Sequence, residues 1–251
     1  MNSLDRAIDE YYKTKIPIDT ICKTFGVGKA TFYRHLPKEN RRGYYNQNRQ
    51  YNFNIQKLIK DSSDKFYWLG FLAADGSVVN NTLIIHLNII DKKHLELFKV
   101  FIEANYNVEE ILNSQNRETS KIQINSFELI SYLRKYNIIQ NKSLIFSIPV
   151  KEIPEKYLFD FLRGLIDGDG CIRINNHQQI SLSFCSGSKK CVEQMNELLG
   201  INNKISKYEN TYSIQVTGNK KAKAILDKLY STSTENTRLS RKYQIYRSLT
   251  K

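Results

Sequence analysis

A short apolar sequence motif that contains Asp-Gly near its C-terminal end occurs twice in the chain. Residues 67–78 read YWLGFLAADGSV, and residues 161–172 read FLRGLIDGDGCI. Each copy holds two small residues four positions apart, Gly70 with Ala74 and Gly164 with Gly168. Positions i and i+4 share one face of a helix, and small residues on a face let a partner helix approach closely. The repeat therefore predicts two helices that pack along their small-residue faces.

Each predicted helix ends in Asp-Gly, at Asp75 and at Asp169. The glycine can take the positive φ that stops a helix, so each carboxylate stands at a helix C-terminus. Such a carboxylate is disfavoured by about 0.3–1 kcal/mol, and two neighbouring carboxylates repel each other. A divalent cation reverses both penalties, and oxygen ligands suit Mg²⁺. One copy alone is more typical of an ordinary hairpin turn, but the pair predicts a magnesium site at Asp75 and Asp169.

Both copies resemble the motif of the LAGLIDADG homing endonucleases, in the form that carries two motifs on one chain. The second copy, Leu162–Gly170, departs from the motif at two of nine positions. The first copy, Trp68–Gly76, is looser and has Ala73 where the family often has an acidic residue. The resemblance implies that Asp75 and Asp169 are the metal-binding and catalytic aspartates. It also implies Mg²⁺ as cofactor, with Mn²⁺ able to substitute.

The composition favours an intracellular protein that binds a polyanion. Hydrophobic residues make up 41% of the chain, enough for a core, and the net charge is +13. Nucleic acid is the first partner that such a charge suggests, and an anionic membrane surface the second. No apolar run approaches a membrane span, and the N-terminus lacks the apolar stretch of a signal peptide. Four cysteines without a CxxC pair favour a reducing compartment, either a bacterial or phage cytoplasm or a DNA-containing organelle.

Residues 1–37 read as a helix-turn-helix domain. Helical periodicity over residues 4–14 precedes a second helix that Asp19 can cap, a turn at Gly26 and a third helix that begins at Gly28. The stretch resembles the DNA-binding domains of resolvases and invertases. The third helix could enter a major groove with four side chains exposed, Lys29, Thr31, Tyr33 and Arg34. A plain three-helix packing unit is the alternative.

Residues 38–62 are predicted to form a basic linker. The stretch mixes arginines and aromatic residues among Asn and Gln, without a steady period. Three arginines could follow the DNA backbone or enter a minor groove, Arg41, Arg42 and Arg49. A merely solvated tether is the alternative.

From residue 63 onward the chain repeats one αββαββα unit, over 63–148 and 149–251. Strands are expected at 76–80, 82–90, 108–114 and 119–125, and again at 170–175, 179–185, 201–208 and 211–217. Helices are expected at 64–75, 91–105 and 127–136, and at 155–169, 188–199 and 219–230. The resulting fold class is α+β, a pseudo-twofold pair of units with two saddle-shaped antiparallel sheets. One face of each sheet can pack on helices while the other meets DNA. The polar strand residues predicted to contact DNA are Asn88, Gln123, Arg173 and Gln215.

Two lysines occupy roughly equivalent places in the two units, Lys142 and Lys242. The family carries a basic residue in each half that reaches the scissile phosphate, and by that resemblance both lysines are assigned as catalytic. The family also often has a polar residue that orients water at the end of the second strand. Asn88 stands there in the first unit, whereas Cys185 stands there in the second. No His or Ser is arranged as a nucleophile, so water is the expected attacker.

These features together predict a site-specific, double-strand DNA endonuclease of the homing type. It would act as a monomer on double-stranded DNA, with no protein partner and no membrane. Three alternatives remain: a non-catalytic DNA-binding regulator of the same fold, an RNA-splicing maturase, and a site-specific recombinase, which residues 1–36 alone suggest. Both aspartates argue against the first, the helix-turn-helix against the second, and the absence of a recombinase-like Ser or Tyr catalytic domain against the third.

Overall fold

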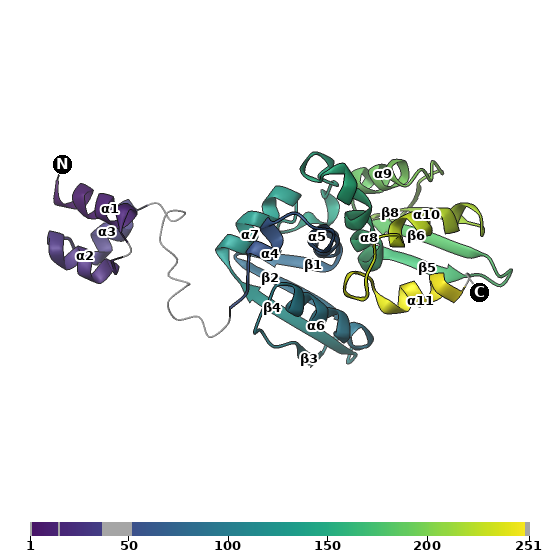
Figure 1. Cartoon of the computed structure of the whole chain (residues 1–251), viewed down its shortest axis with the longest axis horizontal. Coiled ribbons are helices and arrows are strands. Elements are labelled where there is room, and N and C mark those ends of the chain that lie inside the picture. The colour runs from purple at the N-terminus through teal and green to yellow at the C-terminus, as the bar shows by residue number, and fades with distance from the viewer. Residues whose placement is uncertain (1, 15, 37–51, 249–251) are drawn as a thin grey trace. The chain divides into compact units, whose positions relative to one another are not determined.

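The computed structural model describes residues 2–14, 16–36 and 52–248, which fall into two compact units, Met1–Gln50 and Tyr51–Lys251 (Figure 1). Each unit has its own hydrophobic core. Arg41, Arg42 and Arg49 lie outside the described residues. Among the described helices, none combines the length and the apolar character that a membrane span requires.

The first unit consists of three short helices, α1 (Ser3–Lys13), α2 (Ile18–Phe25) and α3 (Lys29–His35). Asn2 caps α1, because its side chain accepts a hydrogen bond from the backbone N–H of Asp5 at 2.8 Å. Gly26, with φ of 63°, ends α2 and turns the chain toward α3. Asp19 does not cap α2 as predicted. The cap position belongs to Pro17, and Asp19 lies in the first turn, where it pairs with Lys29 at 2.6 Å.

The second unit contains two halves with the same order of elements. The first half comprises α5 (Ser63–Asp75), β1 (Gly76–Val79), β2 (Thr82–Asn88), α6 (Lys92–Phe101), β3 (Glu109–Leu112), β4 (Glu118–Asn125) and α7 (Phe127–Leu133). The second half comprises α8 (Leu158–Asp169), β5 (Gly170–Ile174), β6 (Ile180–Ser186), α9 (Lys189–Leu198), β7 (Ser206–Tyr208), β8 (Thr211–Thr217) and α10 (Lys221–Tyr230). A further helix, α11 (Ser240–Ser248), follows. The sequence did not predict α11.

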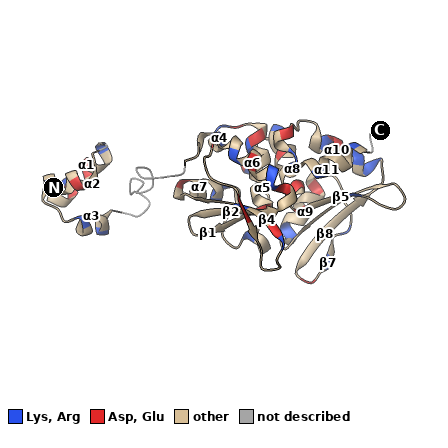
Figure 2. Ribbon diagram, turned by 90° about the horizontal axis from the view of Figure 1, so that it is seen from below, with Lys and Arg blue, Asp and Glu red and all other residues tan. Residues whose placement is uncertain are grey.

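Each half forms one four-stranded antiparallel sheet, and the strand orders are equivalent. They are β1-β2-β4-β3 and β5-β6-β8-β7. The predicted α+β fold with two antiparallel sheets is therefore confirmed. In Figure 2 the helices of the unit lie on one side of both sheets, and in the described part of the chain no helix covers the other side. We call that side the open face.

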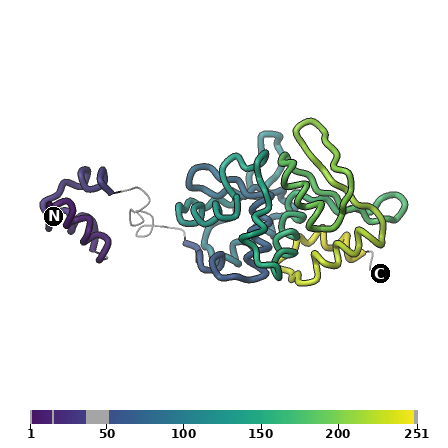
Figure 3. The backbone as a smooth tube through the Cα atoms, turned by 90° about the horizontal axis from the view of Figure 1, so that it is seen from above, coloured from purple at the N-terminus to yellow at the C-terminus, as the bar shows by residue number. Residues whose placement is uncertain are grey.

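The two halves occupy opposite ends of the second unit, as the backbone trace shows (Figure 3). Helices α5 and α8 lie side by side where the halves meet (Figure 1). Nearly all of α5 is buried, with Phe66, Trp68 and Leu72 at its centre. A helix that is apolar all round belongs in a core, so this pair holds the two sheets together.

The end of the predicted linker is in fact part of the second unit. Residues 56–59 form a short helix, α4 (Gln56–Ile59), and Leu58 is fully buried in the core of the first half. The backbone N–H of Asn54 donates to the carbonyl of Ile102 at 2.7 Å. Phe53 and Ile55 pack against the same core. Burial of these three apolar side chains attaches residues 52–62 to the first half instead of leaving them as a tether.

Candidate metal centre and nucleic-acid interface

Helices α5 and α8 are in backbone contact through their small residues. A Cβ atom added at Gly70 would lie 2.0 Å from the carbonyl oxygen of Phe161, and one at Gly164 would lie 2.1 Å from that of Tyr67. Near the C-terminal ends, a Cβ at Gly168 would lie 2.3 Å from the Cβ of Ala74. Any side chain larger than hydrogen would push the helices apart at these three glycines. The motif residues thus set the distance between the helices and keep their ends together.

The two aspartates meet where the helices end. Asp75 is the last residue of α5 and Asp169 the last residue of α8. The carboxylate of Asp75 lies beside Gly168, 3.0 Å from where a Cβ at that position would stand. Burial and the charge of Asp169 raise the pKa of Asp75 to about 7. Burial also raises the pKa of Asp169, which the two lysines partly offset.

Each of the two predicted lysines caps the end of its own half's motif helix. The ammonium of Lys142 donates to the carbonyls of Ala74 at 3.2 Å and Gly76 at 2.7 Å. Cations at a helix C-terminus complement the negative end of the helix dipole. Burial lowers the pKa of Lys142, and the charges of Asp169 and then Asp75 oppose the decrease.

Lys242 is held by more partners than Lys142. Its ammonium donates to four carbonyl oxygens at the end of α8, those of Ile166, Asp167, Gly168 and Gly170, at 2.6 to 3.2 Å. Only 3% of the residue is exposed. An ammonium has three N–H groups, so these carbonyls use all of them. The structure thus revises the prediction that this lysine reaches a phosphate directly, because its donors are committed to the backbone.

The donor set at the helix ends fits Mg²⁺. Two carboxylates converge, and the nearby backbone carbonyls are bound to the lysines. Within the described residues, no three His, Cys, Asp or Glu side chains form a group that could hold a metal. Mg²⁺ is commonly bound through one or two carboxylates together with water and substrate phosphates, so a two-carboxylate site suits it. A cavity of about 270 Å³ lies beside Asp169 and is lined also by Lys142, Ala74 and Cys185 among others.

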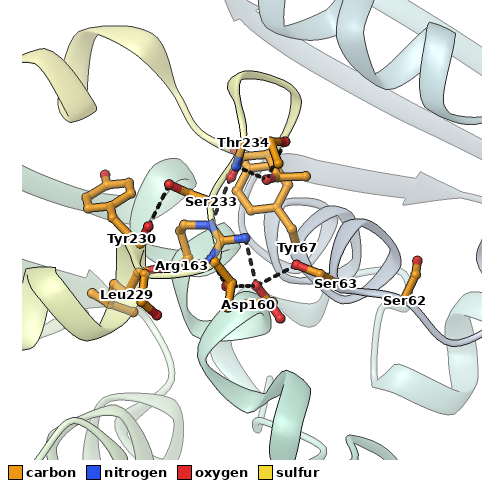
Figure 4. A network of polar contacts seen from close by, with 12 residues as sticks. Ser62, Ser63, Tyr67, Asp160, Arg163, Leu229, Tyr230, Ser233 and Thr234 are labelled. Atoms are coloured by element: carbon orange, nitrogen blue, oxygen red, sulfur yellow. Dashed lines mark hydrogen bonds and ion pairs between the residues drawn. The ribbon is translucent and has the colours of Figure 1, made fainter.

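A buried ion pair stabilises the start of α8 (Figure 4). Arg163 is fully buried, and its Nη2 contacts Asp160 Oδ1 at 2.8 Å. Its remaining donors reach the carbonyls of Leu229 and Thr237, each at 2.8 Å. Ser63, at the start of α5, donates to the same carboxylate at 2.8 Å, which links the two halves. A buried ion pair needs such additional hydrogen bonds to offset its desolvation.

A second buried carboxylate, Asp167, joins the two halves near the aspartate pair. It accepts hydrogen bonds from the hydroxyl of Tyr67 at 2.9 Å, the hydroxyl of Tyr230 at 3.0 Å and the N–H of Leu239 at 2.8 Å. The Tyr67 hydroxyl also lies 2.8 Å from His94 Nε2. Burial lowers the pKa of His94 to about 3, so the imidazole is neutral. No role was predicted for Asp167 from the sequence, although it is the motif acid that Ala73 replaces in the first copy.

All four strand residues predicted to contact DNA lie on the open face. Gln123 is paired with Ile84, Arg173 with Ser181 and Gln215 with Ser183, and alternate residues of the same strands are buried. Asn88 is exposed at the end of β2, where its side chain also accepts from the N–H of Ile90. Gln215 donates to the hydroxyls of Ser181 and Thr217 at 3.0 and 3.1 Å.

The open face carries few positive charges. Among the strand residues the cations are Lys121, Arg173 and Lys207, and pairing places Lys207 opposite Tyr212, on the helix-covered side. In Figure 2 most Lys and Arg residues of the unit lie on helices and connecting segments. On α3 of the first unit, Lys29, Thr31 and Arg34 are exposed while Tyr33 is half-buried.

Comparison with known proteins identifies the fold. Residues 156–230 match the family described as LAGLIDADG-like domain. No curated protein matches the sequence. The meganuclease I-SmaMI bound to uncleaveable DNA is similar in structure, with 13% identity, a TM-score of 0.52, and coverage of 74% of this chain and 88% of that chain. I-SmaMI bound to cleaved DNA is also similar, with 14% identity, a TM-score of 0.51, and coverage of 76% of this chain and 88% of that chain.

A third solved structure, the N-terminal LAGLIDADG domain of DUF199/WhiA, has 18% identity, a TM-score of 0.46, and coverage of 72% of this chain and 90% of that chain. The family match is confined to residues 156–230, and the fold of the second unit is similar to that of the LAGLIDADG meganuclease I-SmaMI. The predicted resemblance to this family is confirmed at that level.

Proposed function

We propose that the protein is a divalent-metal-dependent endonuclease that cleaves both strands of a specific DNA site. The observation that carries the proposal is the meeting of Asp75 and Asp169 at the adjoining ends of α5 and α8. Two carboxylates placed side by side at helix C-termini cost folding free energy unless a cation binds between them. Such an arrangement is expected of a metal site and is unfavourable in a merely structural element.

DNA is the substrate that the surroundings of this centre favour. The chain carries a net charge of +13, and its structural relatives of the meganuclease class were solved with DNA bound. The open face presents amide and hydroxyl groups from Gln123, Gln215 and Ser183, which can hydrogen-bond to base edges. Uncharged side chains that hydrogen-bond to bases give sequence preference, while contacts to the phosphates supply most of the affinity.

Asp75 and Asp169 would hold Mg²⁺ at the scissile phosphates, and Mn²⁺ could take the same place. When bound, the metal activates a water molecule and neutralises charge on the phosphoryl group. The chain's own residues fix the geometry, since Lys142 and Lys242 hold the helix ends and so the carboxylates. Their positive charges also lower the pKa of both aspartates. The lysines thereby favour the ionised form that a metal requires.

The first unit would add affinity for DNA through α3. Lys29, Thr31 and Arg34 are exposed there. The first 60 residues carry 12 Lys and Arg against 5 Asp and Glu, which is more than half of the surplus charge. A second DNA-binding module on the same chain raises affinity because its binding is intramolecular. A chain that begins at residue 52 is expected to keep cleavage but to bind DNA with a smaller salt dependence.

A plasmid library with randomised inserts tests the proposal directly. The purified protein is incubated with the library in Mg²⁺ or in EDTA, and the ends of linear products are sequenced. The expected result is a single consensus cut in both strands with Mg²⁺, no cut in EDTA, and no cut by the Asp75→Asn and Asp169→Asn variants. Specific binding without any cut would instead identify a DNA-binding regulator. Cleavage that persists in either variant would refute the two-aspartate centre.

A further inference from the structure

The lysine in α11 cannot serve a phosphate, but the residue before it can. The ammonium of Lys242 is buried and uses all its donors on carbonyls at the end of α8. Arg241 stands beside it at the start of α11, and 48% of its side chain is exposed. Of the two adjacent cations, Arg241 is therefore the one that remains available to a ligand.

Arg241 is held by one edge only. Its Nε donates to both carboxylate oxygens of Asp91, each at 3.0 Å. Asp91 ends the 3₁₀ turn Ile89–Asp91 that follows β2, and its side chain is only 8% exposed. No hydrogen bond joins Nη1 or Nη2 of Arg241 to another described residue. A guanidinium has five N–H donors in a planar fork, so the four Nη N–H groups remain, and two of them lie on the end-on edge that can bind a phosphate.

The strand register places this guanidinium on the Asp75 side of the metal centre. Gly76, which follows Asp75, is paired with Ile85 on β2. Strand β2 therefore continues past the end of α5 as far as Asn88, and the turn that carries Asp91 comes next. The charge of Asp91 contributes to the raised pKa of Asp75, in keeping with this proximity.

The other half has no equivalent of this pair. Asn141 precedes Lys142 where Arg241 precedes Lys242. Ser188 caps α9 where Asp91 precedes α6, and its hydroxyl donates to the carbonyl of Phe146 at 2.6 Å. The two halves are thus unequal, because an Asp91–Arg241 ion pair lies after β2 and no such pair lies after β6.

We propose that Arg241 is a phosphate-binding residue that contacts the DNA backbone on the Asp75 side of the centre. Asp91 is its positioning residue, because it fixes the Nε edge and turns the Nη edge outward. This inference rests on the proposed nuclease function and adds a consequence to it. The two strands are cut at different rates, since only one scissile phosphate has this extra cation.

The test compares Arg241→Ala, Arg241→Lys and a control with wild type on one duplex labelled at both strands. Lys223→Ala is the control. Lys223 forms an ion pair with Asp227 on α10, and this helix lies on the helical side of the sheet, away from the open face. Under single-turnover conditions with Mg²⁺, Arg241→Ala is expected to slow one strand by about 100-fold and the other by far less. Arg241→Lys recovers part of the rate, and the control cuts both strands as wild type does.

Binding measured in EDTA gives a second readout that does not depend on cleavage. Arg241→Ala should lower the slope of log K against log salt by about 0.9, the value for one phosphate contact. Because the variant leaves Asp91 buried and unpaired, Asp91→Asn/Arg241→Ala is measured beside it to separate misfolding from a lost contact. That double variant should fold and keep the one-strand defect.

Equal rates for both strands in Arg241→Ala, with an unchanged salt slope, would overturn the role of Arg241 while leaving the nuclease intact. Slowing of both strands to the same extent would also overturn it, since that result indicates general distortion. A wild-type protein that neither binds nor cuts DNA would remove the proposed function and this inference with it.

Discussion

Replacing Asp75 with Asn should make the metal-free protein more stable while it abolishes cleavage. Asp75 stands at a helix C-terminus beside a second carboxylate, and its pKa is raised from 3.8 to about 7. A shift of about 3 pKa units corresponds to about 4 kcal/mol between the two protonation states. Asparagine has nearly the shape of the protonated acid and carries no charge. It therefore removes the repulsion without leaving a cavity.

The sign of the pH dependence follows from proton binding. Between about pH 4 and pH 7 the folded protein holds a proton on Asp75 that the unfolded chain has lost. The free energy of unfolding of wild type therefore falls as pH rises through this window. At pH 8 in EDTA, Asp75→Asn should be more stable than wild type by up to about 4 kcal/mol. At pH 4 the two proteins should differ little, because Asp75 is then protonated in the folded state.

Trp68 provides a probe that reports on the right unit. It is the only tryptophan of the chain and is fully buried in α5, so its fluorescence follows unfolding of the second unit. Urea titrations at both pH values, with EDTA and with Mg²⁺, give the free energies. Glu128→Gln, on an exposed carboxylate of α7, is the control for the loss of one negative charge elsewhere in the unit. Mg²⁺ should stabilise wild type at pH 8 and not Asp75→Asn. Equal or lower stability of Asp75→Asn at pH 8 would refute the reasoning.

Three further substitutions test other parts of the structure. Gly164→Ala would place a methyl 2.1 Å from the carbonyl oxygen of Tyr67 and should cost about 3 kcal/mol or more in a urea titration. Gly28→Ala, with only Thr31 Oγ1 within 4 Å, at 3.6 Å, should cost about 1 kcal/mol or less, because it weakens only the N-cap of α3. Similar values for both would contradict the close helix contact. Lys242→Met should lower the melting temperature more than Lys142→Met, because it leaves four backbone carbonyls without their hydrogen-bond donor instead of two. The reverse order would argue against the role of Lys242 in binding these carbonyls. Gln215→Ala should reduce discrimination at one base pair of the DNA site by about 1–3 kcal/mol and leave the salt dependence of binding unchanged. A competition assay against duplexes with single base-pair substitutions measures this discrimination. A loss of affinity that is uniform across sequences would instead indicate a phosphate contact.

The main elements were predictable because their signals are local. The repeated Gly-x-x-x-small spacing and the Asp-Gly ends mark α5 and α8, and alternation in residues 179–185 marks β6. Residues 52–62 gave no such signal. Phe53, Ile55 and Leu58 lie among Asn and Gln without a helical or strand period, and only the core of the first half explains their burial. The helix α11 has a mostly polar sequence, and packing against α10 and β5 supports it.

The candidate site was predictable in its residues but not in its contacts. Asp75 and Asp169 follow from the doubled motif, and the lysines followed from the family resemblance. The sequence does not reveal that Lys242 turns inward to carbonyls more than 70 residues away. Nor does it reveal that Arg241 meets Asp91 across 150 residues. Contacts of this range depend on how α11 packs against the rest of the second unit, which no local pattern encodes.

The contact between Tyr67 and Asp167 makes the two halves of the second unit complementary and not interchangeable. In the aligned motifs Phe161 stands where the first half has Tyr67, and Ala73 stands where the second half has Asp167. A pair of two second halves would place the Asp167 carboxylate against a Phe161 ring. A pair of two first halves would place the Tyr67 hydroxyl against the Ala73 methyl group. If the halves were expressed as separate polypeptides, they should assemble as a mixed dimer and reject self-pairing. The buried hydroxyl–carboxylate contact therefore favours one copy of each half, and their connection in one chain ensures this one-to-one ratio.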